Sequence, residues 1–191
     1  MESFLVSTGL VALAEIGDKT QLLALVLAAR FRRPLPIVLG ILVATIANHA
    51  LAGVLGAWIT TALRPDALRW ILGLSFLAMA LWMLVPDTLD DVSPTLTRFG
   101  VFGTTLVTFF LAEIGDKTQI ATVALAARYP SLPLVVLGTT LGMMIANVPA
   151  VLLGGRLSHR LPTRLVHGVA ALLFALLGIA ALLGAGKRLG M

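Results

Sequence analysis

Hydrophobic residues gather in six long runs along the chain, and short segments with proline, arginine or aspartate separate the runs. A helix needs about 20 apolar residues to cross the roughly 30 Å hydrocarbon core of a bilayer. The runs approach or exceed this length, and they lack the strict alternation of a membrane β-barrel strand. The pattern predicts an all-α membrane protein with six transmembrane helices at about 4–28, 36–61, 68–85, 100–127, 132–155 and 166–185.

The second half of the chain repeats the first. Residues 14–21 and 112–119 both read Ala-Glu-Ile-Gly-Asp-Lys-Thr-Gln, and we call each copy an octet. Shorter matches follow each octet in the same order, so the similarity extends beyond the motif. The pairs Leu39-Gly40 and Ala47-Asn48, for example, recur as Leu137-Gly138 and Ala146-Asn147.

This repeat predicts the topology. Each half holds three helices, and because three is odd, the second half must start on the opposite side of the membrane. Inverted repeats of this kind are an architecture of secondary transporters, whose sites lie near the midplane where the repeats meet. We therefore expect one membrane domain with a first three-helix repeat at 1–86, an acidic central loop at 87–98 and a second repeat at 99–191.

The composition supports a membrane protein and argues against several other kinds of protein and site. Only 12% of the residues are charged, whereas soluble domains carry about 25%. The chain has no cysteine, which excludes disulfides and thiolate metal sites. The net charge of +5 does not indicate nucleic-acid binding, because the basic residues stand singly or in small groups at the ends of the runs. The N-terminal run lacks a charged n-region and a cleavage site, so we interpret it as a membrane helix.

The basic residues also predict an orientation. Seven lysines and arginines fall on the side that holds the loops after the first, third and fifth helices, and five fall on the other side. The positive-inside rule then places those loops in the cytoplasm and both termini outside. We expect an integral protein of a prokaryotic inner membrane, with the lipid bilayer as a partner; formation of a homo-oligomer stays open.

Each octet places charge in the middle of an apolar run. Glu15 lies roughly 16 Å into its helix, where an ionised carboxylate costs at least a few kcal/mol unless it is paired or hydrated. On a continuous helix, Glu15 and Asp18 face the same side, and Gln21 continues that side. Gly17 lies between the two acids and either permits the close approach of a neighbour or allows the helix to break.

Opposed repeats bring both octets to one site. Four carboxylates in one cavity cannot all stay ionised without a cation, since like charge and desolvation both disfavour the charged form. Carboxylate and amide oxygens are ligands that suit Ca²⁺, Mn²⁺ or Mg²⁺. Protons that replace a departing cation, in a coupled titration, would make the site an antiporter. The expected cation ligands are Glu15, Asp18, Gln21, Glu113, Asp116 and Gln119, with Asn48, Asn147, Thr20 and Thr118 as further candidates; the four acids would also carry the protons.

Other roles stay open for some of these residues. A lysine among cation ligands repels the substrate, so Lys19 and Lys117 either pair with acids as structural contacts or take part in transport. Asn48 and Asn147 serve either as interhelical hydrogen bonds or as ligands. A purely structural reading of the octets, as buried Glu–Lys pairs, is weaker because buried ion pairs stabilise proteins poorly.

The octets resemble a family signature. The pattern Glu-x-Gly-Asp-Lys/Arg-Thr/Ser, once in each three-helix half, is similar to that of a broad family of cation/proton exchangers. The resemblance covers two motifs, six apolar runs and an acidic central segment, which is essentially the entire chain. It implies Mn²⁺ and Ca²⁺ as substrates, H⁺ as counter-ion, and Glu15, Asp18, Glu113 and Asp116 as metal ligands.

We therefore expect a secondary transporter that exchanges a divalent cation, Mn²⁺ first and Ca²⁺ next, for protons, and neither an enzyme nor a protein with a tightly bound cofactor. Two alternatives stay open, an exporter of a small organic solute such as an amino acid and a passive cation channel without proton coupling. A metal-dependent hydrolase is disfavoured, because the octets lack a nucleophile or a histidine pair beside the acids.

Overall fold

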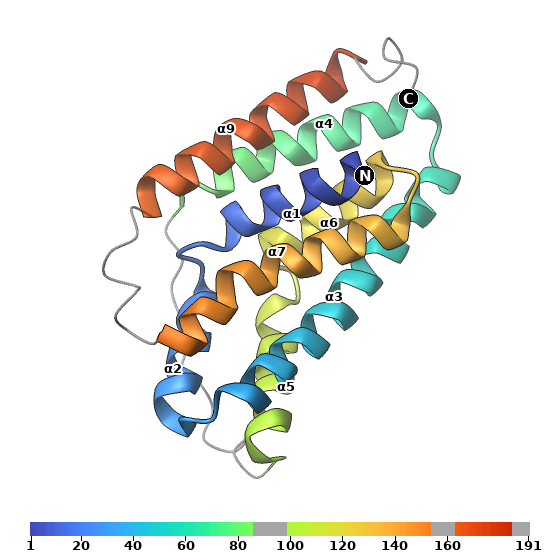
Figure 1. Cartoon of the computed structure of the whole chain (residues 1–191). Coiled ribbons are helices and arrows are strands. Elements are labelled where there is room, and N and C mark those ends of the chain that lie inside the picture. The colour runs from blue at the N-terminus through green and yellow to red at the C-terminus, as the bar shows by residue number, and fades with distance from the viewer. Residues whose placement is uncertain (86–98, 154–162, 185–191) are drawn as a thin grey trace.

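A computed structural model describes residues 1–85, 99–153 and 163–184 of the chain. These residues form eight helices and no strand (Figure 1), which confirms the all-α prediction for this part of the chain. The acidic loop predicted at 87–98 lies outside the described residues. The helices are α1 (Glu2–Glu15), α2 (Lys19–Phe31), α3 (Pro34–Ala62), α4 (Pro65–Trp82), α5 (Gly100–Glu113), α6 (Lys117–Arg128), α7 (Leu132–Leu153) and α9 (Thr163–Leu182).

Three of the described helices are long and apolar enough to cross a membrane by themselves. They are Pro34–Ala62, Leu132–Leu153 and the segment Arg164–Leu182 of α9, which correspond to the second, fifth and sixth predicted spans. Large hydrophobic side chains such as Leu51 and Trp58 remain exposed on the outer surface. Soluble monomers seldom expose apolar surface on this scale, so the surface fits contact with lipid.

The first and fourth predicted spans are not continuous helices. α1 ends at Glu15 and α2 begins at Lys19, while α5 ends at Glu113 and α6 begins at Lys117. The prediction that Glu15 and Asp18 share one helix face is therefore wrong, because the first residue ends a helix and the second caps the next. Of the two outcomes open to Gly17, the structure has the break.

Backbone geometry explains why both runs break at the same place. Gly17 has φ of 85° and Gly115 has φ of 76°, a left-handed conformation that glycine adopts without a steric cost. Asp18 and Asp116 follow in extended conformation as N-caps of α2 and α6. Aspartate favours this position because its carboxylate accepts hydrogen bonds from the first turn and because the helix N-terminus is partially positive.

The long helices α3 and α7 each pack against the broken helix of the other half. α3 contacts α5 and α6, whereas α7 contacts α1 and α2, and α3 and α7 also contact each other. The two run in opposite directions: the start of α3 and the end of α7 line one cavity, and Gly53 near the end of α3 packs against Leu132 at the start of α7. This reciprocal packing brings acidic residues of the two octets together in the interior of the bundle.

Matched glycines allow the reciprocal packing. A Cβ atom on Gly40 of α3 would lie 3.0 Å from the carbonyl oxygen of Phe102 on α5. On Gly138 of α7, it would lie 2.6 Å from the carbonyl oxygen of Phe4 on α1. Phe4 and Phe102 are 98 residues apart, as the octets are. Both halves therefore use the same contact, in which the absence of a side chain lets two helices approach.

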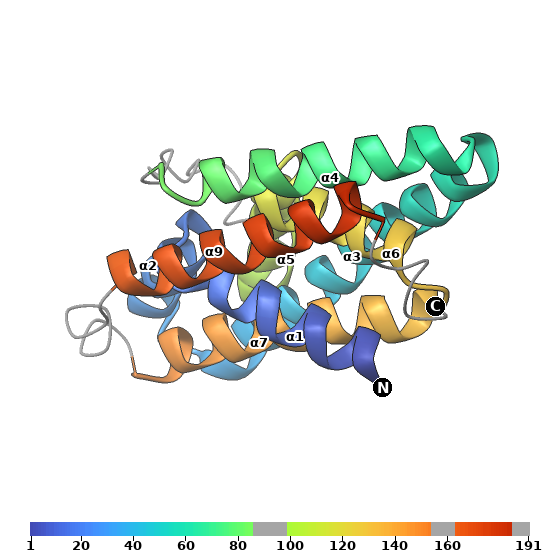
Figure 2. The same cartoon turned by 90° about the horizontal axis from the view of Figure 1, so that it is seen from above.

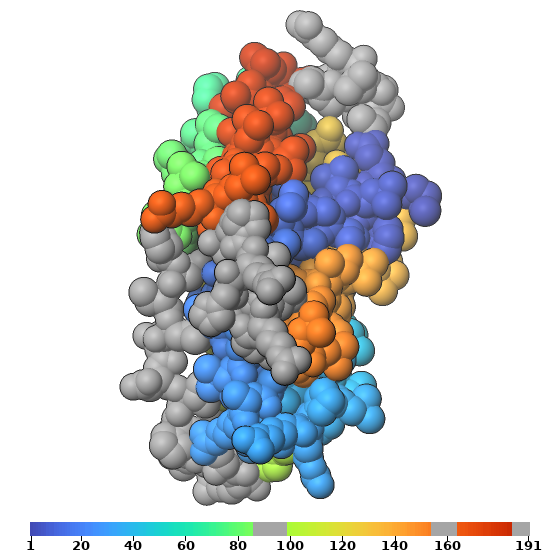
Figure 3. Space-filling model, turned by 60° about the vertical axis from the view of Figure 1, so that its left-hand side comes forward, coloured from blue at the N-terminus to red at the C-terminus, as the bar shows by residue number. Residues whose placement is uncertain are grey.

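α4 and α9 pack along each other at one side of the bundle (Figure 2). Their contact includes Phe76 and Phe174, whose ring centroids are 6.2 Å apart. α4 also contacts α6, and α9 contacts α1, beside which it lies at the surface in Figure 3. The pair therefore covers one member of each broken helix.

Candidate functional site

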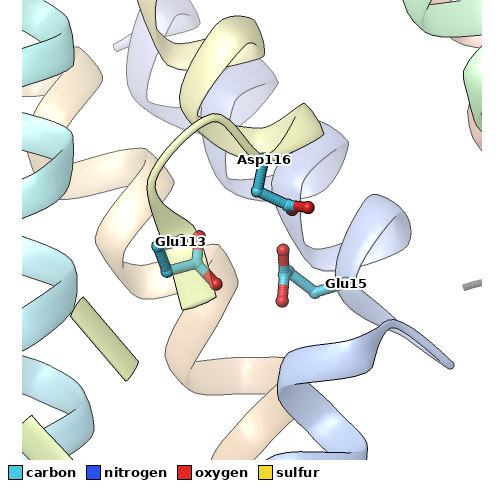
Figure 4. A group of neighbouring side chains, drawn as sticks. All are labelled: Glu15, Glu113 and Asp116. Carbon is cyan, nitrogen blue, oxygen red and sulfur yellow. The ribbon is translucent and has the colours of Figure 1, made fainter. Parts of the chain in front are cut away.

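Three acidic side chains from both octets meet in the interior. Glu15 ends α1, Glu113 ends α5 and Asp116 caps α6, and all three are buried. One carboxylate oxygen of each residue lies within 4.8 Å of the others, and Figure 4 shows the three groups turned toward one another. The prediction that the octets meet is thus confirmed in geometry, with three acids in the closest group instead of four.

A threonine orients each glutamate. The Thr20 hydroxyl donates to Oε2 of Glu15 at 2.6 Å, and the Thr118 hydroxyl donates to Oε2 of Glu113 at 3.0 Å. The other oxygen, Oε1, of each glutamate has no hydrogen-bond partner among the described residues. Each octet thus keeps one glutamate oxygen engaged within its own turn and leaves the second for the shared group.

The aspartates and lysines pair crosswise between the octets. Nζ of Lys19 lies 2.8 Å from Oδ1 of Asp116, and Nζ of Lys117 lies 2.5 Å from Oδ1 of Asp18. Asp18 also accepts a hydrogen bond from the Thr20 backbone at its other oxygen. Asp18 is therefore outside the closest group of acids, and both lysines form ion pairs that join the two halves.

Each glutamine side chain forms a hydrogen bond with the glycine at the helix break of its own octet. The side-chain oxygen of Gln21 accepts from the backbone N–H of Gly17 at 2.9 Å, and that of Gln119 accepts from Gly115 at 2.8 Å. The Gln21 amide also donates to the carbonyl oxygen of Ala146 on α7 at 2.9 Å. In this arrangement the glutamine oxygens are engaged by backbone, so their role as cation ligands stays a prediction.

The two asparagines occupy matched positions with different partners. The amide of Asn48 on α3 donates to the Phe110 carbonyl on α5 at 3.1 Å, which is an interhelical hydrogen bond. The amide of Asn147 on α7 donates within its own helix to Met143. Both side-chain oxygens are buried and lack a hydrogen-bond partner in the described part of the chain, so both remain candidate ligands.

The sequence analysis missed a histidine at this site. Nε2 of His167 on α9 lies 2.6 Å from the carbonyl oxygen of Ile16, at the break between α1 and α2. A helix break leaves carbonyl groups without a partner in the helix, and this ring nitrogen takes one of them. The available signal was a histidine near the start of an apolar run, but only the packing of α9 on α1 shows which group it meets.

Comparison with known proteins assigns the chain to a family. The profile of the family described as "Divalent cation/proton antiporter GDT1" matches residues 3–91 and 101–188. The chain belongs to the GDT1 family. The match covers both halves of the chain, and the resemblance that the octets indicate is therefore confirmed.

Several known proteins are similar to this chain over most of its length. A Vibrio cholerae protein named "Putative manganese exporter" is 52% identical over 181 residues, which cover 94% of this chain and 90% of that protein. "GDT1-like protein 5" of Arabidopsis thaliana is 30% identical over 221 residues, which cover 96% of each. A GDT1-like protein of Synechocystis is 29% identical over 190 residues. No solved structure matches the chain.

Proposed function

We propose that this protein exchanges a divalent cation for protons across a membrane, through one site that the two octets share. The observation that carries the proposal is the buried group of Glu15, Glu113 and Asp116, whose oxygens lie within 4.8 Å of one another. Ionised carboxylates this close repel one another, and burial removes the water that would solvate their charge. A bound cation or bound protons relieve the repulsion, and exchange of one for the other is antiport. Transport is therefore the activity we assign, not catalysis.

Mn²⁺ is the substrate we place first, with Ca²⁺ next. The unpartnered oxygens at the site are carboxylate and amide oxygens, which are hard ligands that suit both ions. The name of the Vibrio cholerae relative refers to manganese, which favours Mn²⁺. The ligands we propose are Glu15, Glu113 and Asp116, with Asn48 and Asn147 next; Asp18, Gln21, Gln119, Thr20 and Thr118 act in this arrangement through pairing and orientation.

Charge balance supports exchange with protons. Two crosswise pairs, Lys19–Asp116 and Lys117–Asp18, balance two acids with two lysines. Glu15 and Glu113 then hold the remaining negative charge, which one divalent cation or two protons would neutralise. A charged group in a bilayer interior is costly, so the octets favour states in which their charge is balanced.

We further propose six spans in two inverted repeats that alternate access to the site. α1–α2, α3 and α4 form the first repeat, and α5–α6, α7 and α9 form the second. The opposite directions of α3 and α7 and their matched glycine contacts support this arrangement. Broken helices whose ends meet near the midplane are common at ion sites of such transporters. Residence in a prokaryotic inner membrane with both termini outside is part of the proposal.

The test is cation transport in proteoliposomes with a pH dye inside. We expect Mn²⁺ entry to drive proton exit, and E15Q and E113Q each to abolish both, because each removes one carboxylate of the shared group. Ca²⁺ is measured in parallel for preference. Cation flux that moves no protons would indicate a channel. Cation flux that survives both substitutions would show that the octets are structural, and no cation flux at all would favour an organic solute.

A further inference from the structure

The two octets are identical in sequence but unequal in their surroundings. The Lys19 side chain is 29% exposed, and its partner Asp116 is 2% exposed. The Lys117 side chain and its partner Asp18 are both 0% exposed. Two lysines at matched positions therefore differ in exposure, and the local sequence does not explain the difference.

The two aspartates also differ in the partners of their carboxylate oxygens. Asp18 uses Oδ1 for Lys117, and its Oδ2 accepts from the Thr20 backbone N–H at 3.3 Å. Asp116 uses Oδ1 for Lys19, and its Oδ2 has no hydrogen-bond partner among the described residues. Asp116 also belongs to the close group with Glu15 and Glu113, which Asp18 does not. One aspartate is thus committed to a helix cap and a buried ion pair, while the other has an oxygen turned toward the shared group.

We propose that the two lysines have different tasks, in which Lys19 is a displaceable cation that neutralises Asp116 until the divalent cation binds, and Lys117 permanently holds Asp18 out of the ligand group. The inference rests on the proposed function and adds the role of the lysines to it. A divalent cation that binds Glu15, Glu113 and Asp116 competes with the Lys19 ammonium for the same carboxylate. Lys19 can leave because part of its side chain is not covered by protein. We assign this opening to water, because an ammonium that faces lipid alone is very unfavourable.

Lys117 cannot leave in this way, because its side chain is fully buried. Separation of a fully buried ion pair leaves an uncompensated charge on each partner, and this is far more unfavourable than separation of an exposed pair. The same reasoning predicts that a divalent cation displaces only one of the two lysines, so the site keeps one built-in positive charge throughout the cycle.

Amine labelling with mass spectrometry tests this in the full-length wild-type protein in nanodiscs. A water-soluble acetylating reagent is applied with and without Mn²⁺, and Lys117 is the internal control. We expect Mn²⁺ to raise the labelling rate of Lys19 several-fold and to leave Lys117 unlabelled. Unchanged or reduced labelling of Lys19 with Mn²⁺ would overturn the inference, as would a rise at Lys117 equal to that at Lys19.

Calorimetric titration with Mn²⁺ gives a second measurement. K19Q removes the internal competitor and should bind Mn²⁺ about tenfold more tightly than wild type, since a nearby positive charge repels the ion. K19R restores the charge and should bind as wild type does. Binding by K19Q that is no tighter than wild type contradicts the inference, while the proposed function still stands if wild type transports Mn²⁺. Wild type that neither binds nor transports Mn²⁺ overturns the proposed function itself.

Discussion

At the scale of single residues, each octet works by dividing the oxygens of its acids between internal and shared contacts. Thr20 and Thr118 each engage one glutamate oxygen, and the second oxygen of each glutamate is left for the group between the octets. The motif therefore needs a hydroxyl five residues after the glutamate, a distance that a continuous helix would not bring into contact in this way.

Removal of either hydroxyl should weaken cation binding. A hydrogen bond to a charged group contributes about 1.5–3 kcal/mol, and about 1.4 kcal/mol corresponds to a tenfold change in affinity. We expect T20V and T118V each to weaken Mn²⁺ binding by about tenfold or more in calorimetric titration. T61V is the control, because the Thr61 hydroxyl donates to the Trp58 carbonyl on an exposed part of α3. Wild-type affinity in T20V would show that the hydroxyl does not orient Glu15.

At the scale of helices, the site depends on two breaks and on close helix contacts, and glycine serves both by different means. Gly115 supplies a left-handed turn with open space around it, whereas Gly138 supplies a close contact between α7 and α1. The signals for the break, a glycine followed by an N-cap aspartate, were in the sequence. Hydrophobic pattern did not show the break, because apolar residues continue on both sides of it.

Alanine substitutions should separate these two uses of glycine. The added Cβ of G115A meets no atom of the described residues within 4 Å, but it strains a backbone with φ of 76°. We therefore expect a loss of about 1–2 kcal/mol in the free energy of unfolding. G138A would place its Cβ 2.6 Å from the Phe4 carbonyl oxygen, so a larger loss is expected because two helices must move apart. G9A lies in α1 with open space and should be neutral or stabilising by up to about 1 kcal/mol.

Thermal unfolding in detergent measures this series. The expected order of stability, from highest to lowest, is G9A, G115A and G138A. If G138A were as stable as G9A, the close contact of α7 with α1 would not form in the protein.

At the scale of the whole molecule, the reciprocal packing turns a sequence repeat into a single shared site. The four acids and Lys117 are buried, Lys19 is partly exposed, and the crosswise ion pairs join one half to the other. Neither half forms the close group of carboxylates by itself, because Glu15 comes from one half and Glu113 and Asp116 come from the other. The functional unit we propose is therefore the complete pair of repeats.

The charges of these groups lead to a prediction about stoichiometry. If both lysines stay charged and Glu15 and Glu113 carry the exchanged protons, each Mn²⁺ should exchange for two protons, and the exchange should move no net charge. We expect Mn²⁺ uptake in proteoliposomes to be unaffected by a membrane potential set with K⁺ and valinomycin, while a pH gradient accelerates it. A strong dependence of uptake on the potential would show that one pair gives up or gains charge during transport, or that the cation moves without protons.

The sequence by itself determined the class of the protein and the identity of its central residues. Long apolar runs specify helices for a bilayer because hydrophobic length is a local property, and an exact octet repeat reports two equivalent motifs without any structure. The sequence also predicted that the octets meet, because an odd number of helices in each repeat gives the two halves opposite orientations in the membrane.

Only the tertiary structure decided which groups touch. Three features depend on how segments far apart in the sequence pack: the crosswise pairing of lysines, the separation of Asp18 from the other three acids and the contact of His167 with Ile16. Identical octets acquire unequal burial because the helices around them differ. α6, which begins at Lys117, contacts α1, α3, α4 and α7, whereas α2, which begins at Lys19, contacts α3, α5 and α7. Residue pattern describes one chain segment at a time, whereas burial and charge pairing depend on every segment that packs around it.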